Sequence, residues 1–479
     1  MSTFSQLNTA PATVDFVKSY VAEEFENVVP VGGKVIHVSK ADTATDTRTG
    51  LSAYDATRPF ATPAAAKAVA VSGDTIHVWP GNYTITASLA KNGVNWDFDV
   101  STVTLVSPTV SIWDDGNTAM TFRVSGRAAF VHEAFGAYSP TNEASKTVWV
   151  RHASSRIIIE CASFTTSGDG VGKLAVTVVF QAAGYLEIHC AGDISATSSS
   201  AQSAYTLWWV NGEGHIFCTN LLSNHGTIYT EVSATPTGDW YVTADYCGGF
   251  VYVTGSNSVA ALWMTFRVIK DNASDQGCLQ VIGDIGTGLG GTRVYLTCQK
   301  AFGAILCHSF SSLIYFRADK HTATTSGGIA GLFALGNFGN NPFSGTFYYD
   351  VTHSEPAAVT GAMMGLQGTG TTHLVRLNFV SGANALGLEL VSGTVVCHDV
   401  IIDTSANSAT NPITLQGTPT TLKLMANTTL ISQGARKCVN VTSGTHTLRS
   451  YGAHANNTAH ASVTTIVPAA GLVVDASVT

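Results

Sequence analysis

Short stretches in which hydrophobic and polar residues alternate follow one another along most of the chain, and this pattern predicts β-strands. In TIHVW at 75–79, the alternation places Ile76 and Val78 on one side of an extended chain and His77 on the other. From about residue 94 onward no helical periodicity is seen, and such stretches are separated by Gly, Ser, Asn and Thr. We therefore expect an all-β fold.

A repeat in the middle of the chain predicts how these strands are arranged. Spacings of 29, 28 and 29 residues separate Cys161, Cys190, Cys218 and Cys247, and the first three end the similar stretches RIIIEC, YLEIHC and GHIFC. A fixed period in the twenties without helices is typical of a solenoid of stacked coils. A β-sandwich has no reason to repeat an inward cysteine in this way. We predict a parallel β-helix in which these three cysteines stack internally beside Ile159, Ile188 and Ile216.

Two helices are expected ahead of the coils. Residues 13–26 (TVDFVKSYVAEEFE) show helical spacing but form too short a helix to be stable alone. This helix either packs on the body or bundles with copies of itself as a handle for docking or trimerisation. Thr62 and Pro63 are a good N-cap and first residue for a second short helix, which ends before Gly73.

The second helix connects two similar strands, VIHV at 35–38 and TIHV at 75–78. A strand–helix–strand unit of this kind makes its two strands parallel, so we expect His37 to lie beside His77. The stretch offers no third ligand, and we expect no metal there. The chain divides into a helical attachment segment, a capping start and a β-helix body with irregular final rungs, at 1–31, 32–93 and 94–479.

The capping start resembles that of pectin-lyase-like right-handed parallel β-helix proteins, especially those of phage tail spikes. The resemblance covers 34–86 and is carried by VIHVSK, GLS, PFAT, the Ala-rich helix, GDTI and PGNY. It implies a right-handed β-helix with a helix over its first coil. It also implies a homotrimeric virion appendage that contacts host-surface glycans, with residues 1–31 reaching other virion proteins.

Composition limits the partners and the chemistry. Only 12% of residues are charged and the net charge is −8, so nothing favours nucleic-acid binding. No apolar segment approaches the roughly 20 residues of a membrane span, so we expect no membrane insertion and a chain that is made and folded in a cytosol. The resemblance to phage proteins implies synthesis in the host cytoplasm followed by assembly into the virion. The nine cysteines include no CxxC pair and are expected to be buried thiols.

Two acidic residues near the capped end form the first candidate for glycan cleavage. Asp97 and Asp99 alternate with hydrophobic residues in VNWDFDV, so both should face outward, about 7 Å apart. Inverting glycosidases use carboxylates at roughly this separation. The alternative is an ordinary solvated surface.

The rungs aligned by cysteine give a second candidate. If Cys161 and Cys190 point inward, Glu160 and His189 point outward on successive rungs, with Glu187 and His215 close by. Stacked carboxylate and imidazole groups can act as acid and base. The alternative is a polar ladder that satisfies its own hydrogen bonds.

Aromatic residues of the same coils are candidates for carbohydrate binding. Trp149, Trp208 and Trp209 lie on the companion strands, and exposed indoles there would stack on sugar rings, with His215 nearby. At least one residue of the Trp208–Trp209 pair must face outward in a strand.

Several other sites have little support. The acidic stretch at 114–117 (DDGN) is either a cation site or a turn, and turns favour these residues in any case. No Arg-x-Pro-x-x-Arg segment is present, which disfavours calcium-dependent pectate cleavage. A phosphate loop, a G-x-S-x-G elbow and an H-E-x-x-H helix are also absent from the sequence, and we expect no metal and no cofactor.

Three functions remain open. The first is a phage tail spike or tail fibre that binds host-surface carbohydrate as a receptor-binding protein. The second is a depolymerase, a glycan hydrolase or lyase on the same β-helix. The third is a purely structural virion protein, such as a head fibre or decoration protein.

Overall fold

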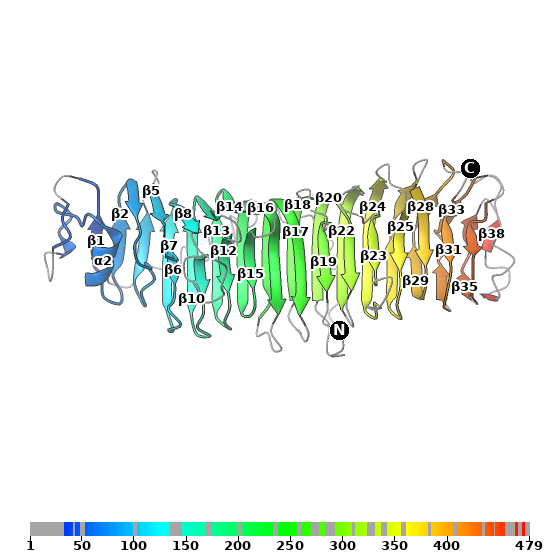
Figure 1. Ribbon diagram of the computed structural model, residues 1–479, viewed down its shortest axis with the longest axis horizontal. Helices are drawn as coiled ribbons and strands as arrows, with labels where there is room; N and C mark the ends of the chain where they lie inside the picture. Colours follow the sequence, from blue (N-terminus) through cyan, green and yellow to red (C-terminus); the bar gives the residue numbers. More distant parts are fainter. Residues whose placement is uncertain are drawn as a thin grey trace.

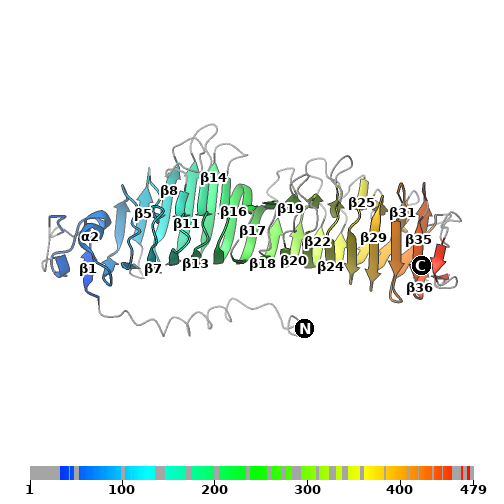
Figure 2. The same cartoon turned by 90° about the horizontal axis from the view of Figure 1, so that it is seen from below.

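The computed structural model is a long right-handed β-helix whose strands lie across the long axis and follow the sequence from one end to the other (Figures 1 and 2). The predicted helix at 13–26 lies outside the described residues. The structure describes residues 33–474 except 42–43, 48–52, 99–102, 109, 135–145, 169–174, 199–203, 233–237, 256–260, 271–276, 283–292, 309–311, 323–330, 337–342, 356–360, 382–384, 407–409, 419, 434–435, 445, 456–464 and 468–471.

The strands pair in three parallel rows, here called faces 1, 2 and 3, and a full coil contributes to each. Face 1 contains β1 (Val35–Val38), β2 (Thr75–Val78), β4 (Asn95–Phe98), β7 (Thr121–Gly126), β10 (Arg156–Cys161), β13 (Tyr185–Cys190), β26 (Thr371–Val375), β29 (Gly393–His398), β32 (Thr420–Leu424), β35 (Thr447–Ser450) and β37 (Thr465–Val467). Face 2 contains β3 (Gly81–Thr84), β5 (Val103–Ser107), β8 (Ala129–Ala134), β11 (Ser163–Gly168), β14 (Asp193–Ser198), β27 (Asn378–Val380), β30 (Ile401–Asp403), β33 (Thr429–Ile431), β36 (Ala453–Ala455) and β38 (Leu472–Val474). Face 3 contains β6 (Trp113–Asp114), β9 (Lys146–Val150), β12 (Ala175–Phe180), β15 (Ala204–Trp209), β19 (Leu279–Ile282), β21 (Ile305–His308), β23 (Phe333–Leu335), β25 (Gly361–Leu366), β28 (Ala385–Leu390), β31 (Ile413–Leu415) and β34 (Val439–Val441).

Six longer strands run around the corners between faces. Two of them contribute to all three faces, β16 (Glu213–Val232) and β17 (Trp240–Gly255). Four pass from face 1 to face 2, namely β18 (Ala261–Lys270), β20 (Arg293–Phe302), β22 (Leu313–Thr322) and β24 (Thr346–Glu355).

Alternation within each strand fills the interior. The inward side of face 1 carries up to three buried residues per rung, as on β10 and β13, and one of these positions stays in register from rung to rung. Each large hydrophobic side chain there contributes roughly 1.5–3 kcal/mol through burial. The registered stack is Ile36, Ile76, Trp96, Val124, Ile159, Ile188, Ile216, Val242, Met264, Leu296 and Phe316. The opposite residues of the same strands must therefore line the outside of face 1.

The capping start has the predicted arrangement. β1 and β2 are parallel, and His37 pairs with His77. Helix α2 (Pro63–Val69) connects them, with Thr62 as N-cap accepting a hydrogen bond from the backbone of Ala65. α2 contacts β1 and β2 at the same end of the β-helix (Figure 2). In the part of the chain that the structure describes, no helix is long and apolar enough to cross a membrane.

The internal stacks predicted from the repeat are confirmed where their register is defined. Cys161 pairs with Cys190, and Ile159, Ile188 and Ile216 stack in register. Cys247 belongs to another stack, because it pairs with Leu221 on face 2. All nine cysteines are free thiols, and burial raises the pKa of Cys247 to about 12.

Candidate functional site

Face 1 brings together the carboxylate and imidazole groups predicted from the cysteine-aligned rungs. Glu160 on β10 pairs with His189 on β13, and Glu187 pairs with His215 on β16. Nε2 of His189 lies 2.5 Å from Oε1 of Glu187, and the Tyr185 hydroxyl donates a hydrogen bond to the second oxygen of Glu187. The predicted ladder exists and satisfies many of its own hydrogen bonds.

The two carboxylates of this cluster differ in their surroundings. Glu160 forms an ion pair with Arg123 of β7, with 3.4 Å between Nη2 and Oε1. Burial acts to raise the pKa of Glu187, but the hydrogen bonds from His189 and Tyr185 and the nearby imidazole charge outweigh it and lower this pKa to about 2. Glu187 is therefore ionised at neutral pH and can act as a base or nucleophile, but not as a proton donor.

Replacing Glu187 by Gln should reduce the sensitivity of the fold to acid. Because the folded-state pKa of about 2 lies below the ordinary 4.5, the ionised group stabilises the fold above about pH 4.5 and loses this effect as pH falls toward 2. Between about pH 6 and about pH 2.5, we expect the free energy of unfolding to fall by about 1–2 kcal/mol more in the wild type than in Glu187→Gln, allowing for solvent screening.

The measurement is urea unfolding at both pH values, with Glu213→Gln as control. Glu213 also lies beside a histidine, with 3.0 Å between its Oε1 and Nε2 of His215, but 49% of its side chain is exposed. The same acid dependence in the wild type and in Glu187→Gln would contradict the assignment.

The carboxylate pair predicted near the cap is only half described. Asp97 lies on the outer side of β4, with 2.8 Å between its Oδ2 and Nδ1 of His77. His37 stands beside His77, with 5.6 Å between ring centroids, and the Trp79 indole donates to Nδ1 of His37. Asp99 lies outside the described residues, so the pair remains a prediction.

The tryptophans predicted as exposed platforms are buried. Trp149, Trp208 and Trp209 expose only 2%, 9% and 1% of their surfaces, so the prediction that they offer open ring faces is wrong. Trp209 points into the coil, where the carbonyl of Gly212 accepts hydrogen bonds from its Nε1 and from that of Trp240. The two neighbouring indoles lie on opposite sides of the strand, because Trp209 belongs to the main core and Trp208 to a different cluster.

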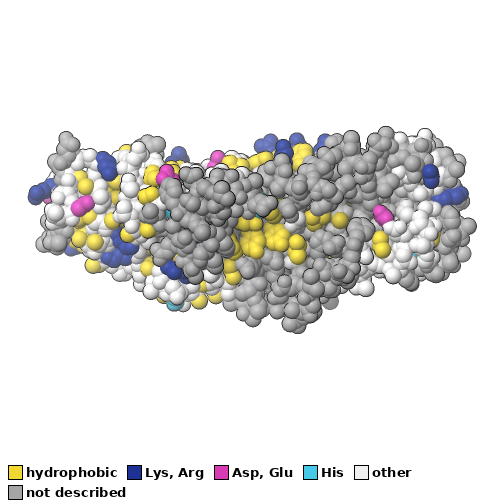
Figure 3. Space-filling model, viewed as in Figure 1, with side chains coloured by type: hydrophobic (Ala, Val, Ile, Leu, Met, Phe, Trp, Pro, Cys, Tyr) yellow, Lys and Arg dark blue, Asp and Glu magenta, His cyan; other side chains and the backbone are white. Residues whose placement is uncertain are grey.

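Neighbouring side chains cover the two indoles of this second cluster, which lies on face 3. Lys146 and Arg151 sit over the Trp149 ring, with Nζ and Cζ at 3.7 and 3.9 Å from its centroid. Figure 3 shows hydrophobic side chains gathered over β15 and β17 in the middle of the face that it draws. The cluster consists of Trp149, Val176, Val179 and Trp208, with Tyr205, Val210 and Tyr229 packed against it.

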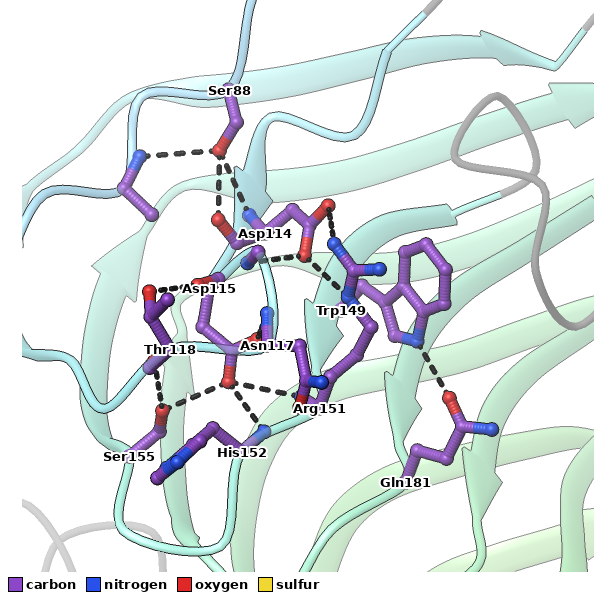
Figure 4. Close-up of polar contacts among 12 residues, drawn as sticks. Ser88, Asp114, Asp115, Asn117, Thr118, Trp149, Arg151, His152, Ser155 and Gln181 are labelled. Carbon is purple, nitrogen blue, oxygen red and sulfur yellow. Dashed lines mark hydrogen bonds and ion pairs between the residues drawn. The ribbon is translucent and has the colours of Figure 1, made fainter.

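The acidic stretch at 114–117 is a structural turn whose carboxylates already have protein partners (Figure 4). Asp114 receives two hydrogen bonds from the Arg151 guanidinium, at 3.0 and 2.7 Å. The fully buried Asp115 accepts from the backbone N–H groups of Arg151 and His152 and from the hydroxyl of Ser155. This favours the turn interpretation over a cation site.

A continuous row of aromatic and imidazole rings lines the outside of face 1, starting at the polar cluster. It occupies seven successive rungs, which at about 4.8 Å per rung extend over roughly 29 Å. We call it the aromatic row, and it consists of His215, Tyr241, Trp263, Tyr295, Tyr315, Tyr348 and His373.

The spacing between neighbouring rings of the row varies along its length. Trp263 and Tyr295 stack with 3.8 Å between centroids, whereas Tyr241 and Trp263 are 6.4 Å apart. Tyr315 and Tyr348 are 5.9 Å apart and tilted by 45°. Tyr241 exposes 37% of its surface. The other six side chains of the row are partly exposed, so solvent reaches the row along its length.

Polar side chains accompany the row on the same outer side. Two residues further along each strand, the register runs Thr243, Thr265, Thr297 and Arg317. Asp350 follows Arg317 and accepts a hydrogen bond from the Tyr315 hydroxyl at 2.9 Å. Face 1 thus offers an apolar strip bordered by hydrogen-bonding groups, the combination expected of a carbohydrate site.

Sequence reasoning found only the first residue of the row, His215. The later signal is an aromatic residue between two inward hydrophobic residues, as in LWM at 262–264, VYL at 294–296 and IYF at 314–316. The connections between these strands differ in length, so the rings do not recur at a constant sequence period. Only the pairing register aligns them.

Metal ligands are not gathered at any of these places. Among the residues that the structure describes, no group of three His, Cys, Asp or Glu side chains is placed to hold a metal ion. His373 and His398 come close on face 1, with 3.4 Å between Nδ1 and Nε2, and burial lowers the pKa of both. Cys397, which precedes His398, is buried, as expected of the cysteines.

The described structure is thus a right-handed parallel β-helix with a polar cluster and an aromatic row on face 1. The resemblance of residues 34–86 to pectin-lyase-like proteins remains a prediction from sequence. No protein-family model, curated protein or solved structure matches this chain.

Proposed function

We propose that the protein binds a cell-surface polysaccharide along the aromatic row, as the receptor-binding part of a phage tail spike or tail fibre. The observation that carries the proposal is the register that aligns rings from His215 to His373 on one outer face. A polysaccharide is itself a repeating linear chain, so a straight repeating surface matches it along many units. The virion setting and a homotrimeric state are implied by the sequence resemblance.

The side chains of the row are better suited to bind sugars than to form the apolar centre of a protein–protein interface. The tyrosines of the row combine apolar surface with a hydroxyl group, and sugar rings likewise combine C–H surfaces with hydroxyls. The threonines that border the row add further donors and acceptors. Ring contacts within the row hold several side chains in place, which lowers the entropic cost of binding.

The test is binding of the full chain to a panel of purified acidic and neutral bacterial capsular and O-antigen polysaccharides, measured by biolayer interferometry. We expect selective, saturable binding to one member or a few related members. Binding to no member of the panel and to no intact bacterial cell would contradict the proposal and would favour a structural virion role.

Cleavage is a second candidate, because the polar cluster adjoins the row. Glu187 pairs with His215, and His215 with Tyr241, so a chain lying on the row reaches the Glu187 and Glu160 carboxylates. If the bound polysaccharide is cut, Glu187→Gln should abolish the release of new reducing ends while changing binding less than about threefold. If Glu187→Gln and Glu160→Gln both release reducing ends at the wild-type rate, the catalytic residues lie elsewhere, for example at Asp97.

A further inference from the structure

We propose that the polysaccharide bound by the aromatic row is anionic and that basic residues around the corner between faces 1 and 2 select it. This inference rests on the proposed function and adds the chemical class of the ligand. Charge is distributed unevenly in the molecule, because the whole chain carries a net charge of −8 while the strands beneath the middle of the row are basic.

These strands carry more basic than acidic residues. β18, β20, β22 and β24 supply four rings of the row and carry six Lys or Arg residues but only three acidic residues. The basic residues are Arg267, Lys270, Arg293, Lys300, Arg317 and Lys320, and the acidic ones are Asp319, Asp350 and Glu355. Figure 3 shows Lys and Arg side chains at the edge of the molecule above β18 and β20.

Pairing aligns part of this charge. On face 2, Lys300 pairs with Lys320, and Lys320 pairs with His353. Each lies five residues beyond a ring of the row on the same strand, so the two rows are parallel and roughly 16 Å apart along the chain. Lys300, Lys270 and Arg267 are exposed. Lys300 and Lys320 thus place basic groups on adjacent rungs, which attracts the acidic groups of an anionic ligand.

Closer to the rings, guanidinium groups outnumber carboxylates. Arg317 lies two residues beyond Tyr315 on the outer side of face 1. Asp350 is 7% exposed and binds Nε of Arg376 at 2.6 Å, with Nε of Arg317 at 3.9 Å. One carboxylate thus faces two guanidinium groups that are each about a third exposed. The excess positive charge lies where acidic groups of a chain on the row would point.

A polysaccharide explains these features better than another polyanion. DNA binding would require a basic groove that follows phosphates, but the row itself is aromatic and uncharged over its middle rungs. An acidic polysaccharide instead places sugar rings on the row and carboxylate or phosphate groups toward Arg317 and Lys300. Arg and Lys bind such groups through charge-assisted hydrogen bonds.

The experiment compares each acidic polysaccharide of the panel with its carboxyl-reduced or dephosphorylated form, using the full chain. We expect the tightest binder to be acidic and to lose at least about tenfold in affinity when neutralised. The double variant Arg317→Gln/Lys300→Gln should lose a similar factor and show a weaker dependence on salt. The matched control is Arg58→Gln/Lys40→Gln, which removes the same charges from exposed positions near the cap and should bind as the wild type does.

Other outcomes overturn the inference in distinguishable ways. A neutral polysaccharide as the tightest binder, or equal affinity after neutralisation, would overturn the anionic class and leave binding on the row intact. Equal losses in the control variant would show a general charge effect. Tighter binding of double-stranded DNA, insensitive to changes in the row, would assign the basic residues to a different polyanion. Binding of no polysaccharide would overturn both proposals.

Discussion

Replacing Trp263 or Tyr295 by Ala is expected to weaken polysaccharide binding by about tenfold each, and replacing both by about a hundredfold. These two rings form the tightest stacked pair of the aromatic row, with 3.8 Å between centroids, and stand near its middle. Removing either ring takes away its own apolar surface and frees its neighbour to change rotamer. A ligand then loses contact area and must also order the remaining ring.

The controls are exposed aromatic residues away from the row. Trp79 and Tyr451 expose 44% and 48% of their surfaces, so Trp79→Ala and Tyr451→Ala remove similar rings without touching the row. Binding isotherms of the four single variants, with thermal unfolding to confirm the fold, make the comparison. If the control and row variants lose affinity equally, or if neither loses affinity, the row is not the binding site.

Replacing Asp115 by Ala is expected to reduce the free energy of unfolding by about 3–5 kcal/mol. Its carboxylate is fully buried and accepts hydrogen bonds from the backbone N–H groups of Asn117, Arg151 and His152. It also accepts from the Ser155 hydroxyl at 2.8 Å. Alanine leaves these donors without an acceptor, and each buried donor without a partner costs about 1–3 kcal/mol.

A matched control is Asp403→Ala. Asp403 also caps a turn, but its bond to the backbone of Ser405 is exposed to solvent. We expect this control to change the free energy of unfolding by less than about 1 kcal/mol. Chemical unfolding followed by far-ultraviolet circular dichroism measures both variants. If Asp115→Ala unfolds at the same denaturant concentration as the wild type, the stability of the turn does not depend on this carboxylate.

Much of the fold follows from local patterns in the sequence. Alternation in TIHV and a good N-cap at Thr62 place β2 and α2 correctly, because both signals depend on near neighbours. The repeat of cysteines aligns Glu160 with His189 and Glu187 with His215, because adjacent rungs there have nearly equal length. A residue's rung and side were therefore predictable where the period is regular.

What covers an outward side chain depends on contacts that sequence spacing does not encode. Alternation required one residue of the Trp208–Trp209 pair to face outward, and this residue is Trp208, yet it is 9% exposed because it packs into a cluster with residues of other rungs. Arg151 lies 37 residues beyond Asp114 in the sequence and binds its carboxylate, so the charge of this acidic stretch is partly neutralised. The aromatic row escaped prediction because its rings are aligned by register and not by a constant period.

Oxidative footprinting of the bound complex tests the central claim most directly. Hydroxyl radicals modify accessible Tyr and Trp side chains, and mass spectrometry locates the change produced by a saturating polysaccharide. We expect protection of Tyr241, Trp263, Tyr295 and Tyr315, with unchanged modification of Trp79 and Tyr451. Unchanged modification of the row, with protection at Tyr205 and Tyr229 on face 3, would contradict the account and move the binding site to the opposite side of the coils.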